Sequence, residues 1–121
     1  GKTGYVQFMA TANEAASGST EFIVMRGKTM PPSWVYCLAR SPDFRQEAIN
    51  RMSGSDGRQR VDWKALAKVE ILIPSDAVAV EFDEVAEGVF REIRLLNKYN
   101  EKLREARDLL LPRLMDGRIP V

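Results

Sequence analysis

Apolar side chains recur every seven residues along the last third of the chain, which is the pattern of a long helix packed against another helix. The repeat lies within residues 75–111, where Gly88 is the only glycine or proline. We call its main apolar positions the seam; they are Phe82, Val89, Ile93, Leu96, Leu103 and Leu110. Pro112 is expected to end or kink this helix, and Gly117 to end the turn that follows it.

A helix of this length cannot bury its seam on one small domain. About 37 residues at 1.5 Å each make a rod of about 55 Å, whereas a domain of about 75 residues is roughly 25 Å across. Each such side chain contributes roughly 1.5–3 kcal/mol when it is buried. We therefore expect a second copy of the chain, or another protein, to cover the seam.

The first 74 residues combine strand and helix signals. Residues 5–9 and 21–26 are β-prone and are separated by turn-forming residues, and a third β-prone segment, residues 69–73, ends at Pro74. Because two strands alone are marginally stable, these strands are expected to belong to a larger sheet.

Three helix starts are predicted between the strands. Ser33 is expected to cap the first helix, residues 41–43 (Ser-Pro-Asp) to start a second helix that Gly54 ends, and Asp62 to cap a short helical turn. The sequence thus predicts an α+β fold, in which a small β-sheet and helix domain is followed by a long C-terminal coiled-coil helix.

The composition excludes several chemistries. Among 121 residues there is no histidine and one cysteine, which rules out His-based triads, His metal ligands, an internal disulfide and a Cys-cluster zinc site. No apolar run reaches the ~18–20 residues that span a membrane, and no signal peptide opens the chain, so we expect a cytoplasmic protein. Because the first residue is not Met, we expect a piece of a longer protein.

Charge is distributed unevenly along the chain. Residues 1–74 carry 10 Lys/Arg and 7 Asp/Glu, a net +3, and residues 75–121 carry 8 and 10, a net −2. Positive charge is densest from Arg40 to Lys68, and a phosphate backbone responds to such local charge within a Debye length of ~10 Å. A net +3 is weak, however, and from charge alone an ordinary solvated surface is the favoured interpretation.

Two features suggest chemistry that other interpretations explain better. Asp43, followed by Asp62-Trp63-Lys64, has the acid–acid–lysine spacing of metal-dependent nucleases, but both acids stand at helix starts and are expected to cap them. Cys37 is expected to lie in the core, because a reactive thiolate needs a base and the chain has no histidine.

Five segments in order resemble the specificity subunit of type I restriction–modification enzymes. They are residues 19–26 (STEFIVMR), 38–45 (LARSPDFR), 52–66 (MSGSDGRQRVDWKAL), 70–74 (EILIP) and 103–119 (LREARDLLLPRLMDGRI). Such a subunit has two target-recognition domains, each of which reads one half of a split DNA site, and two long helices that pair antiparallel. The resemblance implies that residues 1–74 are the later part of one recognition domain and that residues 75–121 are the C-terminal conserved helix.

The resemblance also implies the partners. The subunit is not an enzyme and needs no cofactor or metal of its own; modification subunits bind it and methylate adenine, and restriction subunits add cleavage. Double-stranded DNA and these subunits are therefore the expected partners, together with a self-dimer through the helix when the chain is isolated. The alternative is a coiled-coil interaction domain without DNA binding, which would dimerise and show no affinity for DNA at low salt.

Residues 53–60 form the loop best suited to contact DNA. Its two glycines allow a close approach to another surface, and arginine and glutamine side chains bind base edges and phosphates. The candidates are Arg58, Gln59 and Arg60, followed by Lys64, Lys28 and Lys2. Phosphate contact is favoured over base reading, because a motif shared within a family is a poor carrier of differing specificities. The equally weighted alternative is that the loop packs the domain on its helix.

Overall fold

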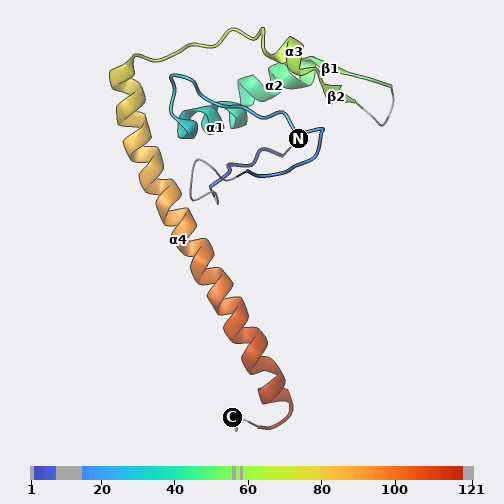
Figure 1. Ribbon diagram of the computed structural model, residues 1–121, viewed down its shortest axis with the longest axis vertical. Helices are drawn as coiled ribbons and strands as arrows, with labels where there is room; N and C mark the ends of the chain where they lie inside the picture. The colour runs from blue at the N-terminus through green and yellow to red at the C-terminus, as the bar shows by residue number, and fades with distance from the viewer. Residues whose placement is uncertain (1, 8–14, 56, 58, 119–121) are drawn as a thin grey trace. The chain divides into compact units, whose positions relative to one another are not determined.

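The computed structural model describes residues 2–7, 15–55, 57 and 59–118, and in these ranges it contains helices and one two-stranded sheet (Figure 1). In chain order the elements are α1 (Pro32–Arg40), α2 (Pro42–Asn50), β1 (Met52–Ser53), β2 (Arg60–Val61), α3 (Trp63–Leu66) and α4 (Asp76–Met115). This confirms the predicted α+β fold with a long C-terminal helix. The chain forms two compact units, Gly1–Asp83 and Glu84–Val121, so the first two turns of α4 belong to the first unit.

α1 begins two residues earlier than predicted, and Ser33 is not its cap. Pro31 is the N-cap residue, no side chain caps the helix, and Pro32 is the first helical residue. Proline suits this place because its ring presets φ and it has no N–H that needs a partner. Ser33 instead lies fully buried in the first turn, where its hydroxyl donates to Oδ1 of Asp83 at 2.5 Å.

α2 begins where the sequence predicts, and one residue joins it to α1. The Ser41 hydroxyl accepts a hydrogen bond from the Phe44 N–H (3.3 Å), and Pro42 and Asp43 occupy the first turn. Ser41 also ends α1, because its N–H and its hydroxyl both donate to the Leu38 carbonyl (3.0 and 2.9 Å). This shared cap makes a tight corner between the two helices and helps to bury Phe44.

In the part of the chain that the structure describes, the strands predicted over 5–9, 21–26 and 69–73 are not formed. Residues 8 and 9 of the first predicted strand lie outside the described residues. The composition of the three segments favours extended backbone, but a strand exists only where its N–H and C=O groups meet those of a neighbour. In the described ranges, the sheet pairs β1 with β2 alone.

α4 is 40 residues long and extends further than predicted at its C-terminal end. Pro112 lies inside the helix and does not end it, because a proline removes only its own N–H bond, while its carbonyl still accepts from the Asp116 N–H (2.9 Å). The helix ends at Met115, and Gly117 ends the turn that follows it, as predicted, with φ +67 and the paired hydrogen bonds of a Schellman motif. None of the described helices is both long and apolar enough to cross a membrane.

The buried core of the described residues is small. Its apolar members are Phe44 and Ala79, and most of the large apolar side chains are exposed. Cys37 is exposed as well, so its predicted place in the core is wrong. Successive helical residues are rotated by about 100°, and Cys37 therefore falls outside the half-buried face that contains Trp34 and Leu38.

Candidate nucleic-acid interface

The basic loop predicted to contact DNA lies at the end of a small β-hairpin. β1 and β2 are antiparallel, with Ser53 opposite Arg60, and at the base of the hairpin the Asp62 N–H donates to the Arg51 carbonyl (3.2 Å). Because the chain turns into the hairpin here, α2 ends before Gly54, and the prediction that this glycine ends the helix is wrong.

Two glycines give the hairpin loop its path. Gly54 and Gly57 have φ of +123 and +81, in the region that L side chains rarely adopt. A Cβ added to Gly57 would meet nothing within 4 Å, so the loop surface is open there. Gln59 is exposed, which leaves its amide accessible to another molecule, and Arg58 lies outside the described residues.

Arg60 is held by an ion pair that the sequence did not predict. Its Nε lies 2.9 Å from Oε2 of Glu21, and the two side chains are 66% and 48% exposed. Glu21 stands in a turn closed by the Phe22 N–H and the Ser19 carbonyl (3.0 Å). An exposed pair of this kind contributes about 0–1 kcal/mol, so a phosphate oxygen can replace the carboxylate at little cost. No local spacing signals this partner, because it is far away in the sequence.

Lys64 follows the hairpin on α3. The Asp62 carboxylate accepts a hydrogen bond from the Lys64 N–H (2.9 Å), which confirms that Asp62 caps this helix. The Lys64 ammonium lies 5.8 Å from the centre of the Trp63 ring, and the side chain is exposed. Asp43 lies in the first turn of α2 and Asp62 caps α3, so both acids of the nuclease-like spacing stand at helix starts. In the described ranges no group of three or more potential metal ligands occurs.

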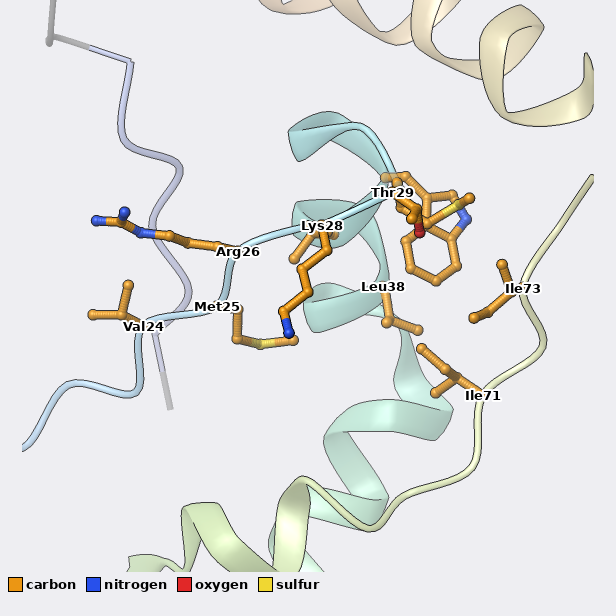
Figure 2. Close-up of a pocket in the computed structure, with 12 residues that line it drawn as sticks. Val24, Met25, Arg26, Lys28, Thr29, Leu38, Ile71 and Ile73 are labelled. Carbon is orange, nitrogen blue, oxygen red and sulfur yellow. The ribbon is translucent and has the colours of Figure 1, made fainter. Parts of the chain in front are cut away.

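Lys28 lines an apolar groove rather than the hairpin. The groove has a volume of about 380 Å³, and its lining residues are Val24, Met25, Arg26, Gly27, Lys28, Thr29, Met30, Trp34, Val35, Leu38, Ile71 and Ile73. In Figure 2 the Arg26 side chain extends away from Leu38 and Ile71, whereas the Lys28 side chain runs toward Met25. Lys2, the remaining candidate, is exposed in the first described segment. The hairpin and α3 thus present Gln59, Arg60 and Lys64, and the other two lysines belong to different segments.

The seam is uncovered along most of α4. Its five members from Val89 to Leu110 are between 43% and 66% exposed, and Phe82 at the first turns is half-buried. Exposed apolar stripes of this size are typical of surfaces that bind another protein.

Comparison with known proteins supports the resemblance drawn from the sequence. The structure found here is a small α+β unit that carries a basic hairpin loop and is followed in the chain by a long amphipathic helix. Over 86 residues, or 71% of its length, the chain is 28% identical to the Type I restriction enzyme HindI specificity subunit of Haemophilus influenzae. The matched region is 19% of that protein, so the chain spans about a fifth of the length of this relative. No family model and no solved structure matches the chain.

Proposed function

We propose that the chain is a DNA-recognition segment of a type I restriction–modification specificity subunit. In this proposal the residues before α4 help to read one half of a two-part DNA site, and α4 pairs with a second helix that holds two such domains apart. The chain does no chemistry itself, and modification and restriction subunits bind the assembly. The similarity to a curated specificity subunit carries the proposal, and the exposed seam of the 40-residue helix supports it.

The length of α4 suits a spacer between two half-sites. Forty residues at 1.5 Å each make about 60 Å, which is the length of about 18 base pairs at 3.4 Å per step. Only part of this length needs to separate the half-sites, because each domain covers its own half-site.

DNA contact by the hairpin loop is tested by the salt dependence of binding. In the assembled enzyme, replacing Arg58 and Arg60 with Ala should weaken binding to the target duplex and reduce the salt slope by up to about two, because each phosphate contact contributes about 0.9. Replacing Arg91 and Arg104 together with Ala is the matched control, since both are exposed arginines of α4. An unchanged slope in the double variant would remove the loop from the interface.

The ion pair at Arg60 gives a second, opposite test. Glu21→Gln removes the carboxylate that competes with a phosphate for the Arg60 guanidinium, so the affinity for DNA should rise by a few fold at low salt. In an Arg60→Ala background the same substitution should have a smaller effect. If both effects are equal, Glu21 does not act through Arg60.

Pairing of α4 is tested in the isolated chain by analytical ultracentrifugation. Leu96→Glu places a charge on the seam and should shift a dimer toward monomer. Lys98→Glu is the control, because it introduces the same residue about 200° around the helix. A chain that dimerises through the seam but gives an assembled enzyme without affinity for DNA at low salt would favour the coiled-coil interaction domain instead.

A further inference from the structure

An aromatic–arginine cluster lies on α1, outside the set of predicted DNA contacts. The rings of Tyr5 and Tyr36 stack with their centroids 5.1 Å apart and 21° between their planes. Arg40, one turn after Tyr36, places its guanidinium carbon 5.6 Å from the centre of that ring. Its Nη1 also donates to the Tyr36 hydroxyl at 2.8 Å. The guanidinium is therefore held both by a ring and by a hydroxyl.

This cluster occupies the side of α1 that faces away from its apolar stripe. At about 100° per residue, Tyr36 and Arg40 lie within about 40° of each other, on the opposite side from the half-buried Trp34 and Val35. Tyr5 and Tyr36 are themselves half-buried, whereas Arg40 is exposed. The cluster thus combines an ordered aromatic base with an accessible cation.

The charge of Arg40 is not balanced by a carboxylate in the residues that the structure describes. The arginines that form ion pairs there are Arg51, Arg60, Arg94, Arg107 and Arg118. An arginine side chain is charged at every pH of interest, and the hydrogen bond with Tyr36 raises the pKa of Arg40 further above its ordinary value. Four of its five N–H donors are left for another acceptor once Tyr36 has taken one.

We propose that Arg40, positioned by Tyr36 and Tyr5, binds a backbone phosphate of duplex DNA. This site is separate in sequence from the hairpin loop, and the proposal rests on the DNA-recognition function proposed above. A guanidinium presents a planar fork of donors that matches two phosphate oxygens. Holding the side chain in place beforehand lowers the conformational entropy that is lost on binding.

A DNA phosphate is favoured over an acidic protein partner for two reasons. The chain resembles a DNA-recognition subunit, and Arg40 and the hairpin loop both fall in the basic stretch from Arg40 to Lys68.

The test measures the affinity of the assembled enzyme for two fluorescent DNA duplexes of equal length as the salt concentration is varied. One duplex contains the target site of the enzyme and the other does not. Arg40→Ala should lower the salt slope by about 0.9, which corresponds to about a fivefold loss of affinity at 0.15 M salt. The loss should be similar for both duplexes, since a phosphate contact carries no sequence information. Arg104→Ala, which makes the same change in net charge on α4, should leave the affinity and the slope unchanged.

Two conservative variants separate positioning from charge. Tyr36→Phe keeps the ring and removes the hydroxyl, so the affinity should fall by about twofold while the salt slope stays the same. Arg40→Lys should also keep the slope and lower the affinity. If Arg40→Ala prevents folding, as judged by its thermal unfolding, these two variants decide the question, and wild-type affinity in both would overturn the proposal.

The remaining outcomes are equally decisive. If the wild-type enzyme does not prefer its target duplex, the DNA-recognition function itself is wrong. If it does, and Arg40→Ala binds DNA with wild-type affinity and slope, the phosphate contact alone is wrong. If Arg40→Ala weakens assembly with the modification subunits but leaves the salt slope unchanged, Arg40 contacts an acidic protein surface and the proposal is overturned.

Discussion

Replacing Ser33 with Ala should destabilise the chain more than the same substitution at any other serine. Ser33 is fully buried, and its hydroxyl donates to the Asp83 carboxylate at 2.5 Å. A hydrogen bond to a charged group contributes about 1.5–3 kcal/mol, and its loss leaves a half-buried carboxylate without that donor. Alanine is the better helix former by about 0.5 kcal/mol, which offsets only a small part. The expected net loss is about 1–2.5 kcal/mol.

Urea unfolding followed by circular dichroism measures this loss. With a slope of about 2 kcal/mol/M, a loss of 2 kcal/mol lowers the midpoint by about 1 M. The protein concentration is kept fixed, because self-association through the seam would add to the apparent stability. Ser17→Ala is the control, since Ser17 is exposed, and it should change the free energy of unfolding by less than about 0.5 kcal/mol.

A double-mutant cycle with Asp83→Ala identifies the source of the loss. If the hydroxyl and the carboxylate stabilise the fold through each other, the double variant should be more stable than the sum of the single effects by at least about 1 kcal/mol. The reasoning is refuted if Ser33→Ala unfolds at the wild-type urea concentration, or if the two single effects simply add.

Two glycine substitutions should have opposite effects on thermal stability. Gly27→Ala should destabilise the fold by about 1–3 kcal/mol, because the added Cβ would overlap the Met30 carbonyl oxygen. Gly4→Ala is the control and should be neutral, since a Cβ there would meet nothing within 4 Å. Equal melting temperatures of these two variants would show that the turn at Gly27 relaxes freely. Gly88→Ala should stabilise α4 by about 0.5–1 kcal/mol, since the site is open and glycine is a poor helix former; a lower melting temperature would mean that this position packs closely against something.

The features that the sequence predicts correctly depend on neighbouring residues. Ser41 and Asp62 cap the helices that follow them, and Gly117 ends the turn after α4 with a positive φ. Each of these signals acts over two to five residues, so the local sequence contains all the information needed. The seven-residue repeat extends this logic over the whole of α4.

The features that the sequence misses depend on residues far apart. Ser33 looks like a cap until its partner, Asp83, is known to lie 50 positions away. The pairing of Arg60 with Glu21 is equally non-local. Tyr36 and Arg40 have the spacing of neighbours on a helix, but the stacking of Tyr36 on Tyr5 joins distant parts of the chain, and no local spacing signals it.

The failed strand predictions and the exposed seam have the same physical cause. Phe22, Val24 and Leu72, from the segments predicted to be strands, are 69%, 73% and 95% exposed, and no strand of the described residues pairs with these segments. A β-prone segment is stabilised only when it pairs with another strand, and a heptad stripe only when it packs against another helix. A partner that covers either one binds the folded chain and not the unfolded one, so it adds to stability by mass action. The unfolding free energy of the chain alone should therefore be lower than that of the same residues in the assembled enzyme, and the difference should grow with partner concentration.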